Sequence, residues 1–210
     1  MMPVRIVIMA KAPVAGFAKT RLIPALGAEG AAKLAEKMLR HTLHTALASK
    51  LGRVEICATP DPADLAWQNF NLPSQVNWSA QGDGDLGDRM ARAALCTIQQ
   101  GEAVLLIGTD CPAIDAAFLH HAALALNDHD ASLIPTFDGG YALLGLKKFA
   151  PTLFSNMLWS TDVVAQETLK RMQQLGWQTQ RLPTLHDIDE ESDLQYLPPL
   201  LQPNHLTTAI

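Results

Sequence analysis

The stretch that most constrains the fold of this chain is residues 103–112, AVLLIGTDCP. Its apolar run has no polar residue from Val104 to Ile107, which predicts a strand buried on both faces of a sheet. The run is followed by one acid, Asp110, in a turn that Pro112 closes. Ligands of open α/β sheets bind just beyond the carboxyl ends of such strands, so Asp110 is a candidate site residue. The alternative is that Asp110 caps a helix beginning near Ala113.

Strand-like and helical patterns alternate along the rest of the chain. We expect strands at residues 4–9, 54–58, 76–79, 103–107, 132–136, 141–146 and 177–182. Helices are expected at residues 28–50, 86–100, 113–126 and 162–175, with Ser160 or Thr161 as the cap of the last one. Residues 61–70 read as a helix or an irregular turn. This order predicts an α/β fold with three α/β/α layers around a mainly parallel sheet.

The length and composition of the chain limit the binding partners that we expect for it. The 210 residues, 48% of them hydrophobic, predict one domain over residues 1–197 and a tail over 198–210. A net charge of -5 argues against a nucleic-acid polymer or an anionic membrane as partner, and leaves a small anionic ligand open. The three cysteines are far apart, and no apolar run suits a signal peptide or a membrane span, so we expect a reducing cytoplasm. A homodimer is compatible with the sequence.

The loop after the first expected strand concentrates positive charge. It holds Lys11, Gly16, Lys19, Thr20 and Arg21 in a segment that proline and glycine constrain. Its cations and backbone amides could converge on a phosphate chain. The residues do not match the Walker pattern, because alanine precedes Lys19. The alternative is a solvated basic loop.

Residues 81–90, QGDGDLGDRM, contain the pattern G-x-G-x-x-G before an expected helix. This pattern is typical of dinucleotide-binding folds. The interleaved Asp83, Asp85 and Asp88 argue against a pyrophosphate there, because they would repel it. Hydrogen bonds between Gln81, Gly82 or Asp85 and the donor groups of a sugar or base suit the segment better, and an acidic first turn of a helix is the remaining interpretation.

Two acids, Asp187 and Asp189, flank one apolar residue in the segment HDIDEESDL. In an extended segment two such side chains point the same way. Together with Asp110 they could hold Mg²⁺, which takes carboxylates, waters and substrate phosphates. The alternative is an acidic helix cap.

The segment PTFDGGYALLGL places strong turn formers between two strand-like runs, which predicts a hairpin or an excursion at the sheet edge. Its glycines, Gly139 and Gly140, permit close approach of the backbone to a ligand. We therefore expect this segment to contact the acceptor substrate, with Asp138 and Tyr141 facing the acceptor side of the cleft.

Five segments occur in this order: AKAPVAGFAKTRL, QGDGDLGDRM, GTDCP, DGGYALLGL and HDIDEESDL. Together they resemble the rSAM/selenodomain-associated, glycosyltransferase-like transferases, over residues 4 to about 197. The chain is also similar to the wider nucleotide-diphospho-sugar transferase superfamily of glycosyltransferase A-type fold. That superfamily includes the guanylyltransferases of the molybdenum cofactor and of phospholactate.

The resemblance implies roles for particular residues. The first loop matches the nucleotide-phosphate loop of the superfamily, with Lys19 and Arg21 in place of its usual G-x-G-T-R ending. GTDCP matches the segment whose Asp binds the metal, which gives Asp110 that role. HDIDEESDL resembles the I-D-T-P-E-D-L of sugar-activating cytidylyltransferases and implies a second metal position at Asp189. Glu191 and Ser192 depart from that pattern.

These observations favour a transferase that uses Mg²⁺ or Mn²⁺ and a nucleotide. The preferred reaction is nucleotidyl transfer from a nucleoside triphosphate to a small phosphorylated acceptor, with Lys19, Arg21 and Asp110 as the catalytic residues. The sequence Asp110-Cys111-Pro112 stands where glycosyltransferases of the superfamily carry D-x-D. A glycosyltransferase with a nucleotide-sugar donor is the alternative, followed by an oxidoreductase of NAD type and a non-catalytic nucleotide-binding protein.

Overall fold

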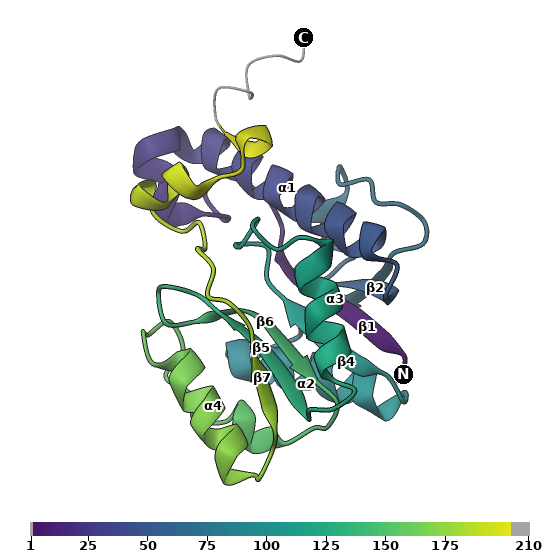
Figure 1. The fold of residues 1–210 in the computed structure, drawn as a ribbon. Coiled ribbons are helices and arrows are strands. Elements are labelled where there is room, and N and C mark those ends of the chain that lie inside the picture. The colour runs from purple at the N-terminus through teal and green to yellow at the C-terminus, as the bar shows by residue number, and fades with distance from the viewer. Residues whose placement is uncertain (1, 203–210) are drawn as a thin grey trace.

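The computed structural model describes residues 2–202 and contains a mixed sheet with helices on both faces (Figure 1). Its strands are β1 (Val4–Lys11), β2 (Gly52–Thr59), β3 (Asn77–Ala80), β4 (Ala103–Ile107), β5 (Ala131–Pro135), β6 (Tyr141–Leu146) and β7 (Thr179–Arg181). The strand order is β3-β2-β1-β4-β6-β5-β7. The neighbours β4 and β6, and β6 and β5, are antiparallel, whereas all other pairs are parallel. The expected mainly parallel α/β sheet is confirmed.

Four α-helices cover the sheet: α1 (Ile23–Ser49), α2 (Leu86–Gln99), α3 (Ala116–Ala125) and α4 (Val164–Gln174). Five short 3-10 helices accompany them: η1 (Thr20–Leu22), η2 (Leu65–Trp67), η3 (Pro151–Leu153), η4 (Glu191–Tyr196) and η5 (Pro199–Leu201). Helices α1 and α3 lie on one face of the sheet, and α2 and α4 on the other (Figure 1). Within residues 2–202, no helix is long and apolar enough to cross a membrane.

The central strands are apolar on both sides because both faces are covered. In β1, Ile6 and Ile8 belong to the core beneath α1 and α3, whereas Val7 belongs to the core beneath α2 and α4. Successive side chains of a strand point to opposite faces, so the middle of such a strand is apolar at consecutive positions. All five residues of β4 are buried, as its sequence predicts.

The expected hairpin is present, with β5 and β6 paired through a turn at residues 136–140. Strand β6 also pairs with β4, so the hairpin lies inside the sheet and not at its edge. The parallel strands β1, β4 and β5 therefore end at the same edge, where β6 begins.

One expected helix cap and one alternative cap are wrong. Asp110 does not cap α3, because Asp115 is its N-cap residue and accepts a hydrogen bond of 2.9 Å from the amide of Phe118. Helix α4 begins after Val163, without a side-chain cap, and neither Ser160 nor Thr161 serves it. The Thr161 hydroxyl instead donates a 2.6 Å hydrogen bond to the carbonyl of Leu158, within the preceding loop.

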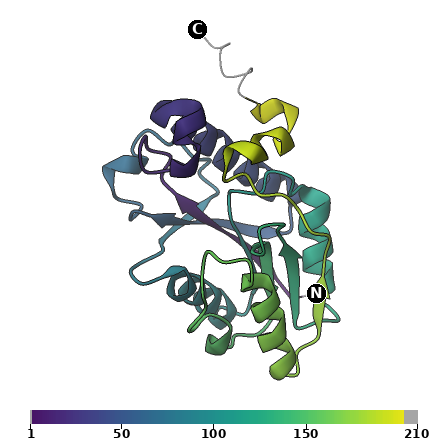
Figure 2. The same cartoon turned by 90° about the vertical axis from the view of Figure 1, so that its left-hand side faces the viewer.

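The segment after β7 crosses back to the first helix. Leu197 and Leu201 are buried against Leu34 and Met38 of α1, and both views place η4 and η5 beside α1 (Figures 1 and 2). The expected tail over residues 198–210 is thus described up to residue 202, and residues 203–210 lie outside the described residues.

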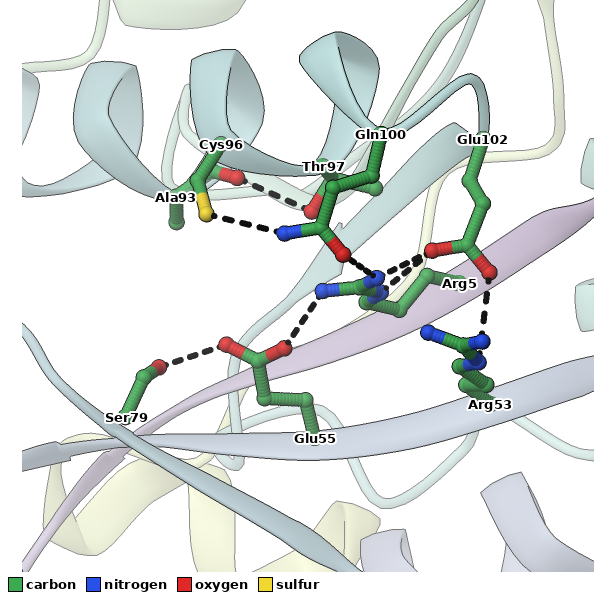
Figure 3. Close-up of polar contacts among 9 residues, drawn as sticks. All are labelled: Arg5, Arg53, Glu55, Ser79, Ala93, Cys96, Thr97, Gln100 and Glu102. Atoms are coloured by element: carbon green, nitrogen blue, oxygen red, sulfur yellow. Dashed lines mark hydrogen bonds and ion pairs between the residues drawn. The ribbon is translucent and has the colours of Figure 1, made fainter.

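A buried ion-pair network holds the opposite edge of the sheet together (Figure 3). Arg5 of β1, only 5% exposed, donates hydrogen bonds to Glu102 (2.8 Å), Glu55 (3.0 Å) and Gln100 (2.6 Å). The outer Arg53 lies 3.7 Å from the same Glu102 carboxylate. Arg5 lies about 20 Å along β1 from Lys11, so this network is remote from the edge where the parallel strands end.

Candidate functional site

A cleft of about 620 Å³ opens at the carboxyl ends of the parallel strands. Its walls come from the loop after β1, the end of β4, the β5–β6 turn, the loop before α4 and the segment after β7. This is where ligands bind in open α/β sheets, and the volume suits a small molecule. The predicted residues that line it are Lys11, Lys19, Thr20, Arg21, Asp110, Asp138, Gly140, Tyr141, Asp187 and Asp189.

At the base of the cleft, one lysine joins two acids that are far apart in the sequence. Lys19 Nζ lies 2.6 Å from Asp110 Oδ1 and 2.9 Å from Asp189 Oδ1. It also donates a hydrogen bond to the carbonyl oxygen of Ile188. The Lys19 side chain is only 6% exposed, whereas those of Asp110 and Asp189 are 50% and 37% exposed. The two carboxylates can therefore be reached from the cleft.

Backbone pairing explains why these acids meet. The amide of Ile188 donates a 2.8 Å hydrogen bond to the carbonyl oxygen of Asp110, and the Cys111 thiol lies 3.2 Å from the carbonyl oxygen of His186. These contacts lay the segment after β7 alongside the end of β4. Asp187 and Asp189 both line the cleft, as expected for acids two positions apart in an extended segment.

The electrostatics of Lys19 follow from its two partners. Burial alone would lower the pKa of its ammonium, but the nearby carboxylates of Asp110 and Asp189 outweigh burial, and the pKa of Lys19 is raised. Lys19 is therefore a permanent cation at this point. Its backbone has φ 49° and ψ 43°, the left-handed conformation that non-glycine residues rarely adopt.

The other two cations of the first loop are more accessible. Lys11 Nζ lies over the ring of Phe17, 4.0 Å from its centroid. The Arg21 side chain is 62% exposed and lies 3.8 Å from Asp189. Gly16, which the sequence analysis places in the same site, does not line the cleft.

Asp187 differs from the other acids of the site. Burial, followed by the charge of the nearby Asp138, raises its pKa to about 6. The carboxylate of Asp138 itself accepts hydrogen bonds from the Thr136 hydroxyl (2.5 Å) and the Gly140 amide (2.9 Å), which close the turn between β5 and β6. Asp138 is thus held in place at the border of the cleft.

The carboxylates of the cleft are the candidate ligands for a metal ion. Among residues 2–202, no group of three or more His, Cys, Asp or Glu side chains is arranged to hold a metal ion. Asp110 and Asp189 form a two-carboxylate set around one cation. Mg²⁺ commonly uses one or two carboxylates and completes its shell with waters and substrate phosphates, so this pair fits Mg²⁺ or Mn²⁺.

Within the β5–β6 turn, Gly139 has a structural role. Its φ is +90°, and a side chain there would collide with the backbone of Asp162 in the loop before α4. Tyr141 lines the cleft, with its hydroxyl 3.9 Å from the sulfur of Met90. Asp138, Gly140 and Tyr141 therefore line the cleft, with the Tyr141 ring packed on the core beneath α2 and α4, whereas Gly139 packs the turn against its neighbour.

Residues 81–85 do not line the cleft, whereas Leu86 and Met90 of the same segment do. Asp85 is the N-cap residue of α2 and forms a capping box with Asp88, as an acidic first turn would. The side-chain amide of Gln81 donates to the carbonyls of Ala10 (3.1 Å) and Cys57 (2.9 Å). Gly82, at φ +71°, packs beside the Arg92 guanidinium.

A second pocket of about 400 Å³ adjoins the cleft and shares Arg21, Asp138, Asp187 and Asp189 with it. One wall is a column of aromatic rings. The rings of Phe137 and His186 stack at 4.2 Å, and those of His186 and Tyr196 at 3.6 Å.

The sequence motifs did not point to these three aromatic residues, nor to several residues of the cleft, among them Met9, Thr109, Trp159 and Asp162. Each of the three aromatics is next to or near one of those motifs. His186 directly precedes Asp187, and Phe137 directly precedes Asp138. This adjacency to a candidate acid is the signal that could have found two of them.

Solved structures of known proteins share this fold. A protein of Desulfovibrio desulfuricans G20 described as a putative nucleotide-diphospho-sugar transferase is 31% identical, with a TM-score of 0.85 over 100% of this chain and 90% of its own. The 4-diphosphocytidyl-2C-methyl-D-erythritol synthase of Anaerococcus prevotii DSM 20548 is 13% identical, with a TM-score of 0.58 over 92% and 95%. Rv0371c of Mycobacterium tuberculosis H37Rv, in complex with manganese, is 15% identical, with a TM-score of 0.54 over 94% and 98%.

The fold is therefore that of the nucleotide-diphospho-sugar transferases and cytidylyltransferases. No curated protein sequence matches the chain. The model of the family DUF2064, described as uncharacterized protein conserved in bacteria, matches residues 42–161. That match covers more than half of the 210 residues, and the chain belongs to the DUF2064 family.

Proposed function

We propose that this protein transfers a nucleotidyl group from a nucleoside triphosphate to a small phosphorylated acceptor, with Mg²⁺ or Mn²⁺ as cofactor. The observation that carries the proposal is the convergence of Lys19, Asp110 and Asp189 at the base of a cleft. Within DUF2064, its motifs favour the rSAM/selenodomain-associated transferases. The 4-diphosphocytidyl-2C-methyl-D-erythritol synthase of Anaerococcus prevotii DSM 20548 shares the fold of this chain.

The nucleotide phosphates would lie along the loop after β1. The cations Lys11 and Arg21 are exposed to the cleft there and would neutralise charge that develops on the phosphates. Asp110 and Asp189 are the residues that would hold the divalent cation. When bound, that cation would polarise the phosphoryl oxygens as a Lewis acid.

The acceptor would occupy the second pocket, beside the shared Arg21, Asp138 and Asp187. Arg21 lines both pockets, so it would bind the phosphate of the acceptor as well as those of the nucleotide. Among the described residues it is the one lysine or arginine of the second pocket. An oxygen of the acceptor phosphate would attack the α-phosphorus of the triphosphate. A new oxygen–phosphorus bond forms, the bond to the leaving oxygen breaks, and pyrophosphate departs. No side chain becomes a nucleophile in this reaction.

A second candidate is glycosyl transfer from a nucleotide sugar. The similar protein of Desulfovibrio desulfuricans G20, at 31% identity, carries the description of a putative nucleotide-diphospho-sugar transferase. The same cleft would bind the nucleotide in both reactions. The products differ, because nucleotidyl transfer releases pyrophosphate and glycosyl transfer releases a nucleoside diphosphate.

A ligand that binds the native state raises the apparent stability of a protein, so thermal unfolding can identify the substrate. Nucleoside triphosphates, nucleotide sugars and NAD(P) are each added with and without Mg²⁺. We expect the largest Mg²⁺-dependent rise in Tm with one nucleoside triphosphate, followed by pyrophosphate release when phosphorylated acceptors are supplied. A rise only with a nucleotide sugar would support the second candidate, and a rise only with NAD(P) would contradict both.

A further inference from the structure

Lys19 is bound more completely than the other cations of the cleft. An ammonium has three protons to donate, and the structure gives Lys19 three acceptors: Asp110 Oδ1 at 2.6 Å, Asp189 Oδ1 at 2.9 Å and the carbonyl oxygen of Ile188. With 6% of its side chain exposed, it presents almost no surface to a ligand. In this arrangement Lys19 has no proton left for a phosphate.

The position of the ammonium is the one that a divalent cation would need. Asp110 and Asp189 each turn one carboxylate oxygen, Oδ1, toward Nζ of Lys19. Two carboxylates this close repel each other unless a cation lies between them. One lysine leaves the trio with a net negative charge, so a divalent cation would neutralise the pair more fully. An ammonium and a divalent cation cannot both occupy the space between these two oxygens.

The loop geometry is compatible with an exchange. Lys19 is the residue before η1 and has the left-handed backbone conformation, φ 49°, which costs free energy in a residue that carries a side chain. The contacts of its ammonium compensate for that cost. A ligand that offers the ammonium other acceptors would remove this compensation, and the triphosphate of the proposed substrate offers several oxygens beside the neighbouring Arg21.

We propose that Lys19 is a positioning residue that holds Asp110 and Asp189 together before a divalent cation binds, and that releases them when nucleotide phosphates take its ammonium. This inference rests on the proposed function for the identity of the phosphate ligand. It assigns Lys19 a role beyond neutralising phosphate charge. Its consequence is an order of binding, in which the free protein binds the divalent cation weakly and the nucleotide and the cation bind together.

The test is to measure Mn²⁺ affinity without nucleotide, from the electron paramagnetic resonance signal of free Mn²⁺. The variant Lys19→Gln keeps a donor for the Ile188 carbonyl but removes the positive charge. Because a competing cation is lost, Lys19→Gln should bind Mn²⁺ at least about tenfold more tightly than the parent protein. The conservative variant Lys19→Arg should bind it as weakly as the parent.

Lys148→Met is the matched control. It removes one positive charge and one ion pair, that with Asp130 at 2.7 Å, from a lysine that does not line the cleft. It should leave Mn²⁺ affinity unchanged. If Lys19→Gln unfolds too readily for titration, its Tm is compared in chelator and in Mn²⁺. The same inference predicts a larger rise in Tm on adding Mn²⁺ than the parent shows.

Equal or weaker Mn²⁺ binding by Lys19→Gln, or a rise in Tm no larger than that of the parent, would overturn the inference. A purely structural Lys19 gives that result, because loss of its contacts would then only destabilise the site. Failure of the proposed function has a different signature. The parent would show no Mg²⁺-dependent rise in Tm with any nucleoside triphosphate, whatever the Mn²⁺ titrations of the nucleotide-free variants show.

Discussion

The backbone amide of Ile188 donates a hydrogen bond of 2.8 Å to the carbonyl oxygen of Asp110. This single contact joins two segments that more than 70 residues separate in the sequence. It fixes the register in which Asp189 lies near Asp110, while the intervening Ile188 side chain is fully buried among residues of η1 and α1. The main chain thus sets the spacing of the two backbone segments, and a side-chain change at either acid should leave that pairing intact.

Asp110→Asn should abolish the Mg²⁺-dependent part of nucleotide stabilisation and change the Tm of the free protein little. The reason is that Asp110 caps no helix and its side chain is half exposed. Thermal unfolding with and without Mg²⁺ and nucleotide measures both effects.

The control for that variant is Asp115→Ala. Loss of the true cap of α3 should lower the free energy of unfolding by about 1 kcal/mol and leave the nucleotide effect unchanged. A normal Mg²⁺ effect in Asp110→Asn would remove Asp110 from the metal site.

Arg21→Ala should lower kcat/KM for the reaction by about 10- to 100-fold, since a hydrogen bond to a charged group contributes about 1.5–3 kcal/mol. Its exposed side chain predicts a change of no more than about 0.5 kcal/mol in the free energy of unfolding. Steady-state kinetics with both substrates varied gives the first quantity and chemical denaturation the second.

Arg40→Ala provides the comparison for Arg21. This arginine is also exposed, pairs with Glu36 on α1, and does not line either pocket. Arg40→Ala should leave kcat/KM unchanged for both substrates. An Arg21→Ala enzyme with the kinetics of the parent would show that Arg21 binds neither substrate.

Arg5→Met should destabilise the fold by about 3–5 kcal/mol, because it leaves the buried Glu102 and Glu55 without their cation. For a chain of this length, that corresponds to a fall in Tm of about 10 °C. Differential scanning calorimetry measures it. Nucleotide affinity, measured well below the lowered Tm, should be unchanged, because the network lies at the far edge of the sheet.

Arg53→Met removes the outer member of the same network (Figure 3). Its side chain is 64% exposed, so its loss should cost about 1 kcal/mol or less. If Arg5→Met and Arg53→Met lowered the free energy of unfolding equally, burial of Arg5 would not explain the stability that it contributes.

The three cysteines should differ sharply in reactivity. Cys96 is exposed, whereas Cys57 and Cys111 are buried. Burial raises the pKa of the Cys57 thiol, and it raises that of the Cys111 thiol to about 12, so both remain protonated and unreactive at neutral pH. Titration with a disulfide reagent should detect one fast thiol in the native protein and three after unfolding. More than one fast thiol, or a fast phase that survives in Cys96→Ser, would contradict this assignment.

Much of the fold could be predicted because local patterns and tertiary burial agree. The apolar run of β4 is buried at every position, and the turn residues at 138–140 separate β5 from β6 as expected. The position of β6 between β4 and β5 could not be predicted, because strand order depends on contacts between segments distant in the sequence. The cap of α3 could not be chosen from the sequence either, since two acids precede this helix and Asp115 fits its start where Asp110 does not.

For the candidate site, the sequence identified most of the charged residues of the cleft but not their partners. Charge composition alone makes Lys19 a ligand for phosphate, and only the fold shows that it is already bound to Asp110 and Asp189. Gln81 has the appearance of a ligand-binding amide in the sequence, yet its donors bind the backbone of β1 and β2. Pairings of this kind cannot be deduced from spacing, because they join different elements.

The convergence of Lys19, Asp110 and Asp189 also bears on synthesis of the protein. A ribosome adds these residues in that order, with most of the sheet made between the first and the last. Contacts between residues so far apart form late, since a long loop must close before they do. While the protein is being translated, its emerging chain can bury β1 against β2 and β4, yet it has no complete set of site residues until the segment after β7 has been added. The candidate site is therefore one of the last parts of this protein to be completed during its synthesis.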